Sequence, residues 1–207
     1  MKKLKTNIGV AIALPILTLV GCGTSQKQEK PNVILILTDD MGYSGITAFG
    51  GQNLHTPALD KLAENGVICT NFYSNAPVSS PTRAAIMTGS YQQRVGLNHI
   101  YSETDPMDGL DPAIHPTFVT QLQNNGYRTG VMGKWHLGQD IMFNPLNNGF
   151  DTFHGYTMGN IDFISHYNTQ RRIDWWYDKE VKDEPGYVTD LINKYAVDFI
   201  KDADGEP

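Results

Sequence analysis

The apolar and polar positions of the chain predict strands that alternate with helices. Residues 33–37 (Val-Ile-Leu-Ile-Leu) are continuously apolar, as in a strand that is covered on both faces. Further strands are predicted at 67–72 and 127–132, and helices at 56–66, 81–88, 117–125 and 187–201. Residues 139–186, rich in Asn, Gly and aromatic side chains, predict a long, loop-dominated insertion. Strands alternating with helices indicate an α/β sheet flanked by helices on both faces.

The helix expected at 56–66 has clear start and stop signals. Thr56 is suited to the N-cap, Pro57 to the first turn and Gly66 to the C-terminal end. The residues expected to form its buried stripe are Leu59, Leu62 and Ala63. Cys69, in the strand expected at 67–72, has apolar neighbours and is predicted to be a small core side chain.

The first 22 residues predict an export signal rather than part of the fold. Lysines in residues 1–5 precede an apolar stretch at 8–20, which is too short to span a bilayer comfortably. The sequence Leu-Val-Gly-Cys ending at Cys22 resembles a bacterial lipobox, in which this cysteine is lipidated; the alternative is an ordinary signal peptide with a chance cysteine. Polar residues 23–31 suit a tether, and the folded part is expected at 32–207. We therefore expect a periplasmic or cell-surface bacterial lipoprotein, held at the membrane by its lipid alone.

Composition and charge exclude several classes of protein. The 207 residues include 16 basic and 22 acidic side chains, for a net charge of −6, which argues against a nucleic-acid binder. With 40% hydrophobic and 18% charged residues the chain can bury a core. The 2 cysteines exclude a disulfide scaffold and a four-thiolate zinc site.

Two adjacent carboxylates follow the first predicted strand. Asp39 and Asp40 stand at the carboxyl end of residues 33–37, the edge at which open α/β sheets bind ligands. Neighbouring carboxylates at such an edge favour a divalent cation, and their oxygens suit Ca²⁺ or Mg²⁺. The alternative is a solvated Asp-Asp turn before Gly42, and this pair alone does not decide between them.

The segment Ser-Ser-Pro-Thr-Arg-Ala-Ala-Ile-Met-Thr-Gly (79–89) places a hydroxyl at the start of a helix. Unpaired N–H groups and the helix dipole favour a tetrahedral anion at this position. Arg83, one turn further, can reach back to Ser79 and offer planar donors to an oxyanion. The alternative is a capped helix start with a surface arginine.

A third motif, Lys134-Trp135-His136, follows the strand expected at 127–132. Residues two apart in extended backbone can point the same way, so Lys134 and His136 can face one site. A lysine there binds an anion, and a histidine moves a proton near neutral pH. The alternative is a surface lysine with a histidine packed near Trp135.

Taken together, these motifs resemble the type I sulfatases of the alkaline-phosphatase superfamily. The resemblance rests on Thr-Asp-Asp (38–40), Ser-x-Pro-x-Arg followed by Ala-Ala-x-Met-Thr-Gly (79–89) and Gly-Lys-Trp-His-Leu-Gly (133–138), in this order. Thr-Pro-Ala-Leu-Asp-Lys-Leu-Ala (56–63) and Gly-Phe-Asp (149–151) also resemble family signatures. The resemblance covers about residues 32–202 and implies an alkaline-phosphatase-like sheet.

The resemblance implies a hydrolase of sulfate esters, on sulfated small molecules or glycans, with a role for each matching residue. Ser79 occupies the position that a maturation enzyme converts to formylglycine, whose hydrate attacks sulfur and then releases sulfate by elimination. Asp39, Asp40 and the modified Ser79 would hold Ca²⁺ in preference to Mg²⁺. Arg83 would stabilise the hydrate, Lys134 would bind a sulfate oxygen, and His136 would take the proton that drives the elimination.

The resemblance also implies groups that residues 139–207 do not contain. Family members have a further half that supplies two more metal ligands, a second lysine and a histidine for the leaving group. We therefore expect this chain to be the N-terminal part of a sulfatase, inactive alone. Two alternatives are a phosphatase or phosphodiesterase that uses unmodified Ser79, and a non-catalytic remnant.

Outside these motifs, the notable residues are His99 and the aromatic run 175–177. The other histidines, apart from His136, are expected to be surface or core polar groups. His99 is the best additional candidate for substrate contact. Trp175, Trp176 and Tyr177 would stack on a sugar ring or form a covered hydrophobic patch.

Overall fold

The structure is a computed structural model that describes residues 30–101, 104–105 and 107–203. The chain divides into two units, residues 1–31 and 32–207, and the helices and strands of the described residues belong to the second. The expected export signal and lipidated Cys22 lie outside the described residues. Within the described ranges, no helix combines the length and apolar character needed to cross a membrane.

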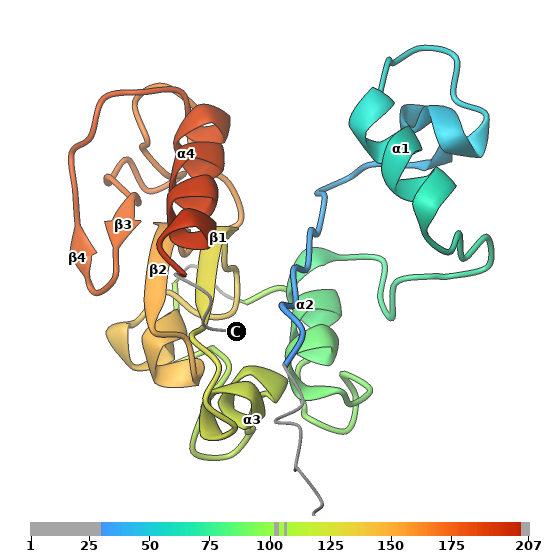
Figure 1. Cartoon of the computed structure of the whole chain (residues 1–207). Coiled ribbons are helices and arrows are strands. Elements are labelled where there is room, and N and C mark those ends of the chain that lie inside the picture. The colour runs from blue at the N-terminus through green and yellow to red at the C-terminus, as the bar shows by residue number, and fades with distance from the viewer. Residues whose placement is uncertain (1–29, 102–103, 106, 204–207) are drawn as a thin grey trace, which may run out of the picture. The chain divides into compact units, whose positions relative to one another are not determined.

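The second unit contains a four-stranded sheet in the order β1-β2-β3-β4 (Figure 1). β1 (Gly130–Lys134) pairs in parallel with β2 (Thr152–Tyr156), in a register that places Lys134 opposite Tyr156. The short strands β3 (Trp176–Tyr177) and β4 (Glu180–Val181) add to β2 as antiparallel neighbours. The α/β prediction is confirmed, and β1 begins three residues later than the strand expected at 127–132.

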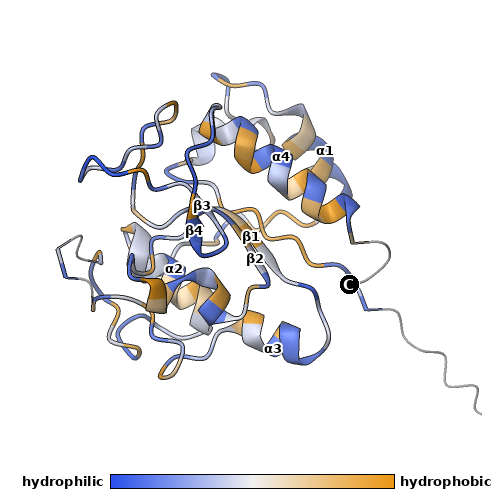
Figure 2. Ribbon diagram, turned by 90° about the vertical axis from the view of Figure 1, so that its left-hand side faces the viewer, coloured by the Kyte–Doolittle hydropathy of each residue, from blue (hydrophilic) through white to orange (hydrophobic). Residues whose placement is uncertain are grey.

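Helices pack on both faces of the β1–β2 pair (Figure 2). α2 (Ser79–Thr88) and α3 (Phe118–Asn124) contribute Ala84, Met87 and Val119 to a core cluster that also contains Phe153 of β2. On the other face, α4 (Val188–Lys201) contributes Val188 and Leu191 to a second cluster around Trp175. Alternation of side chains along a strand places these two clusters on opposite faces.

α1 (Pro57–Asn65) has the predicted bounds, with Thr56 as N-cap and Gly66 as C-cap. The Thr56 hydroxyl gives no capping bond to the helix; its Oγ1 accepts from Thr47 N at 3.0 Å, which ties α1 to the 3-10 helix η2 (Thr47–Phe49). η2 follows another 3-10 helix, η1 (Tyr43–Gly45). The predicted buried stripe is wrong, because α1 has no buried residue and Leu62 is 65% exposed.

The strands expected at 33–37 and 67–72 are absent from the described residues. Val33 is 60% exposed and Ile36 71%, while Val67 and Phe72 are also exposed. Cys69 is exposed too, so its predicted place in the core is wrong. Apolar composition favours a buried strand, but a strand forms only where a neighbouring backbone accepts its hydrogen bonds, and no described segment pairs with these two.

The insertion expected at 139–186 is more ordered than predicted. It contains β2, β3, β4 and two 3-10 helices, η3 (Ile141–Phe143) and η4 (Pro145–Asn148). The polar residues that suggested a loop instead cap these helices: Asp140 accepts from Met142 N, and Asn144 accepts from Leu146 N. Side chains of this type favour caps as much as loops, which is why composition alone misled the prediction.

Candidate active site

Five predicted site residues meet near the carboxyl end of β1, and we call Asp39, Ser79, Arg83, Lys134 and His136 the Ser79 site. Ser79 is the first residue of α2 and Arg83 lies one turn later. Lys134 is the last residue of β1, and His136 follows two residues on. Asp39 comes from the segment after residues 33–37. The site therefore combines a helix N-terminus, a strand end and a loop.

Ser79 Oγ lies between two nitrogen atoms. Arg83 Nε donates a hydrogen bond to Ser79 Oγ at 3.0 Å. His136 Nδ1 lies 2.9 Å from the same oxygen. Because Arg83 Nε can only donate, the hydroxyl proton of Ser79 is available to an unprotonated Nδ1. Both contacts hold the hydroxyl at the positive end of α2.

Two cations hold the carboxylate of Asp39. Lys134 Nζ donates to Asp39 Oδ2 at 2.8 Å, and Arg83 Nη2 approaches Oδ1 at 3.5 Å. Arg83 Nη1 also donates to the backbone oxygen of Lys134 at 2.8 Å, which joins α2 to β1. Burial by itself raises the pKa of Asp39, but the hydrogen bonds and charges of Lys134 and Arg83 outweigh it and hold that pKa below the usual value.

His136 is buried and has a left-handed backbone, with φ of 56°. Burial lowers the pKa of its imidazole to about 4, and the positive charges of Lys134 and Arg83 act in the same direction. The ring is therefore neutral near pH 7, as a proton acceptor must be. Its backbone N–H donates to the Thr157 oxygen at 3.1 Å.

Tyr156, at the end of β2, belongs to the surroundings of the site but was not predicted. Burial raises the pKa of its hydroxyl, and the negative charge of Asp39 raises it further while Arg83 opposes the shift. Its position opposite Lys134 follows from the β1–β2 register. No local sequence signal specifies that register, so Tyr156 could not have been found from motifs.

The described residues fit a divalent cation in donor type but not in number. Asp39, Asp40 and Ser79 offer hard oxygen donors of the kind that Ca²⁺ and Mg²⁺ prefer. Both oxygens of Asp39, however, already contact cationic side chains, and Asp40 is exposed and makes no hydrogen bond or ion pair with the described residues of the Ser79 site. Within the described ranges, no three His, Cys, Asp or Glu residues are grouped closely enough to hold a metal ion. The described residues of this chain could therefore form only part of the ligand shell of such a cation.

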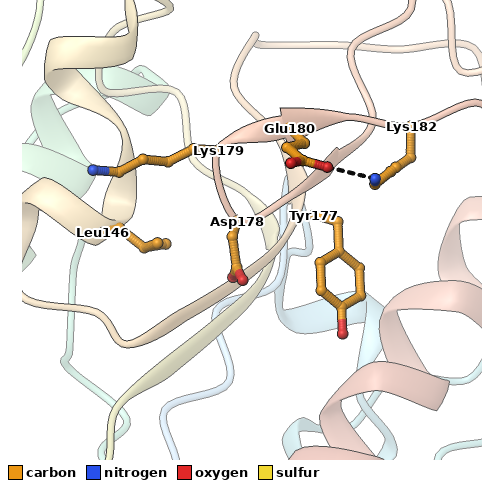
Figure 3. Close-up of a pocket in the computed structure, with 6 residues that line it drawn as sticks. All are labelled: Leu146, Tyr177, Asp178, Lys179, Glu180 and Lys182. Carbon is orange, nitrogen blue, oxygen red and sulfur yellow. Dashed lines mark hydrogen bonds and ion pairs between the residues drawn. The ribbon is translucent and has the colours of Figure 1, made fainter.

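The remaining candidates lie apart from the Ser79 site. His99 is exposed, and its Nε2 lies 3.1 Å from Asp108 Oδ2. Trp175 is buried in the second core cluster and cannot offer a face to a sugar; Trp176 is partly buried, and Tyr177 is exposed. An open hollow of about 630 Å³ is lined by Tyr177, by Leu146 and by residues of β4 and of the segments on either side of it. Figure 3 shows how these side chains lie. No residue of the Ser79 site lines this hollow.

Comparisons with known proteins agree on one family. The family model described as Sulfatase matches residues 31–207. The chain is 31% identical to N-acetylgalactosamine-6-sulfatase of Rattus norvegicus over 92% of its length, and 37% identical to arylsulfatase H of Canis lupus familiaris over 84%. These alignments cover 40% and 34% of the two relatives, so the chain spans two-fifths or less of their length.

Solved structures show the same fold. The complex of Ps i-CgsB with k-i-k-neocarrahexaose matches with a TM-score of 0.78 and 30% identity, over 84% of this chain and 42% of that one. A structure from work on the metabolism of multiple glycosaminoglycans by Bacteroides thetaiotaomicron matches with a TM-score of 0.66 and 26% identity, over 86% of this chain and 49% of that one. These likenesses agree with the expected alkaline-phosphatase-like sheet.

Proposed function

The chain belongs to the sulfatase family, and on that premise we propose that it forms the nucleophile-bearing part of a sulfuric-ester hydrolase. The observation that carries this proposal is the position of Ser79 Oγ, held between Arg83 Nε at 3.0 Å and His136 Nδ1 at 2.9 Å. The nucleophile, a cationic donor and a neutral base are thus in contact before any ligand binds.

The cationic groups of the Ser79 site suit a tetrahedral dianion or its monoester. Arg83 offers donors at the start of α2, where the helix dipole adds positive potential. The Lys134 ammonium lies on the other side of Asp39 and would bind a sulfate oxygen. Because both cations are largely buried, an anion there would be screened less than at an open surface.

His136 would act as the proton acceptor for the group at position 79. Its imidazole is neutral at pH 7, and Nδ1 already faces the hydroxyl oxygen. We assign it the removal of one proton from the hydrated group at this position, which drives the elimination that releases sulfate.

Two groups absent from the structure complete the proposal. Formylglycine made from Ser79 by a maturation enzyme would supply a second hydroxyl, and with it a route to release sulfate. Ca²⁺, in preference to Mg²⁺, would lower the pKa of the nucleophile and neutralise substrate charge. Asp39, Asp40 and residue 79 would be this chain's ligands to it.

Sulfated glycans are the substrates we propose. The relatives and neighbours support this class: one relative is an N-acetylgalactosamine-6-sulfatase, and one neighbour was solved with k-i-k-neocarrahexaose. The export signal and lipidated Cys22 that the sequence predicts support a lipid-anchored protein of the bacterial periplasm or surface, where external glycans are met.

The test is mass spectrometry of the Ser79 peptide after co-expression with a formylglycine-generating enzyme. We expect the peptide to lose two hydrogens, the change from a primary alcohol to an aldehyde, and Ser79→Ala to show no such change. An unmodified peptide would overturn the formylglycine mechanism. Faster hydrolysis of phosphate than of sulfate esters by that unmodified chain would favour phosphoryl transfer, and binding of sulfated glycans with no hydrolysis of either ester would favour a non-catalytic protein.

A further inference from the structure

The carboxylate of Asp174, just before β3, is connected to the Ser79 site through one loop. We propose that Asp174 is a positioning residue for His136, holding the loop 157–159 that fixes both the backbone and the ring of this histidine. The proposal rests on the proposed function for the role of His136, but its geometry is independent of the reaction.

Asp174 is 3% exposed, and its carboxylate accepts four hydrogen bonds. Oδ1 accepts from Thr157 N at 3.1 Å and from Thr157 Oγ1 at 2.8 Å. Oδ2 accepts from Met158 N at 2.8 Å. Trp176 Nε1 donates to Oδ1 at 2.6 Å and holds the carboxylate from the side of β3. Three of the four donors thus belong to two successive residues of one loop.

The same loop contacts His136 in two ways. The Thr157 oxygen accepts the backbone N–H of His136 at 3.1 Å. Gly159 lies against the imidazole so closely that a Cβ there would stand 2.7 Å from Cε1 and 2.8 Å from Nε2. The chain from Asp174 to Ser79 is therefore continuous: carboxylate, loop, imidazole and nucleophile.

The backbone of His136 needs such support. Its φ of 56° is a left-handed conformation, which is uncommon for a residue with a Cβ and persists where surrounding bonds over-determine it. The Thr157 oxygen supplies one of these bonds. Without a fixed Thr157, His136 could relax towards a commoner conformation and turn its ring away from Ser79.

The need to fill space in the core does not explain why residue 174 carries a carboxylate rather than an apolar side chain. Burial raises the pKa of Asp174, which means that the fold tolerates the charged form at a cost. An apolar side chain would avoid that cost but would leave the Thr157 and Met158 N–H groups unpaired. A carboxylate is the side chain that accepts from all these donors at once, because both of its oxygens are acceptors.

The test is NMR spectroscopy of the full chain with Asp174→Asn as the main variant. Asparagine keeps the shape but has only one acceptor oxygen, so the bond from Met158 N or those from Thr157 are lost. We expect the His136 amide to exchange about tenfold faster, the scale of one lost hydrogen bond. We also expect the nuclear Overhauser contact between the His136 ring and Gly159 to weaken.

Three further variants make the result decisive. Asp151→Asn is the matched control, because Asp151 likewise accepts from a backbone N–H and a hydroxyl, those of Thr129, but near the start of β1; it should leave both His136 signals unchanged. Gly159→Ala calibrates the signals of a displaced ring. Thr157→Val removes only the hydroxyl that donates to Asp174, and it replaces Asp174→Asn as the test variant if Asp174→Asn does not fold.

Folded Asp174→Asn with unchanged His136 exchange and an unchanged ring contact would overturn the proposal, as would the same result in Thr157→Val when the first variant is unfolded. Neither readout involves ester hydrolysis. The Asp174 result can therefore be interpreted even if the chain is not part of a sulfuric-ester hydrolase. Likewise, a negative Asp174 result would not contradict the proposed function.

Discussion

The hydroxyl oxygen of Ser79 lies 2.9 Å from Nδ1 of His136, although 57 residues separate them in the chain. The contact joins the first residue of α2 to the loop after β1. It exists because Arg83 bonds both Ser79 and the backbone of Lys134, which holds helix and strand together. Arg83 is therefore a structural link as well as an anion-binding group.

We predict that Arg83→Lys, introduced into the longer sulfatase of which this chain is expected to be the N-terminal part, lowers kcat for aryl sulfate hydrolysis after maturation by about 10²- to 10³-fold, the scale of one lost preorganised donor. Lysine keeps the charge but cannot bond Ser79, Lys134 and Asp39 together, because it lacks the planar fork. Steady-state kinetics measures the effect. Arg128→Lys is the control, since Arg128 donates to the Asp202 backbone and stacks on Phe199, away from the site. Equal losses in both variants would argue against a specific role for Arg83.

A second prediction concerns the charge of Asp39 in the metal-free protein. Asp39 neutralises Lys134 and Arg83, so Asp39→Asn should strengthen the binding of inorganic sulfate by roughly fivefold or more, as expected from removing one nearby negative charge. Lys134→Met should weaken it. Calorimetric titration at low ionic strength measures both, and added salt should reduce the difference.

Weaker sulfate binding by Asp39→Asn would mean that this carboxylate mainly positions the two cations rather than competing for them. Asp60→Asn is a suitable control, because Asp60 lies in the first turn of α1 and outside the Ser79 site. It should leave sulfate binding unchanged.

Signals that are local in the sequence predicted the helices and most residues of the Ser79 site. Pairing between segments far apart in the chain determines which strands form and where Asp174 lies. The helix expected at 117–125 forms as α3, and Thr117 caps it through a bond from Thr120 N to its side chain. Ser79 and Arg83 meet because i and i+4 share a helix face. Residues 33–37 were expected to be a strand, but strand formation depends on partners elsewhere in a sheet. Asp174 was missed for the same reason, since its four bonds depend on where β2 ends and β3 begins.

A third prediction is that His154 makes the fold sensitive to acid. Its ring is buried between Tyr177, at 3.9 Å between centroids, and Tyr195, at 4.2 Å. Its Nδ1 has no hydrogen-bond partner among the described residues. Burial lowers the pKa of this imidazole, which the charges of Asp178 and Glu184 only partly oppose. The folded state therefore binds a proton less readily than the unfolded chain.

The direction in which pH changes the stability follows from the linkage between proton binding by His154 and folding. The contribution of His154 is fully present above the unfolded pKa of about 6.5 and is lost as the pH falls below it. His154→Phe keeps an aromatic ring between the tyrosines and removes the titration. Its free energy of unfolding, measured in urea at pH 7 and pH 5, should decrease less than that of the parent chain. The exposed His55→Gln is the control and should follow the parent; a His154→Phe variant with the parent's pH dependence would contradict the prediction.

The last prediction contrasts an exposed apolar residue with a buried one. Ile36 is 71% exposed in the run 33–37, so Ile36→Lys should change the free energy of unfolding by less than about 0.5 kcal/mol. Phe153 in β2 is 0% exposed, and Phe153→Ala should lower the free energy of unfolding by about 3–5 kcal/mol because it leaves a cavity between α2, α3 and the sheet.

Ile36→Lys should also reduce aggregation and the binding of a hydrophobic dye, since it interrupts a contiguous exposed apolar segment. Chemical denaturation, light scattering and dye fluorescence measure these three effects. A loss of several kcal/mol in Ile36→Lys would show that residues 33–37 are covered in solution.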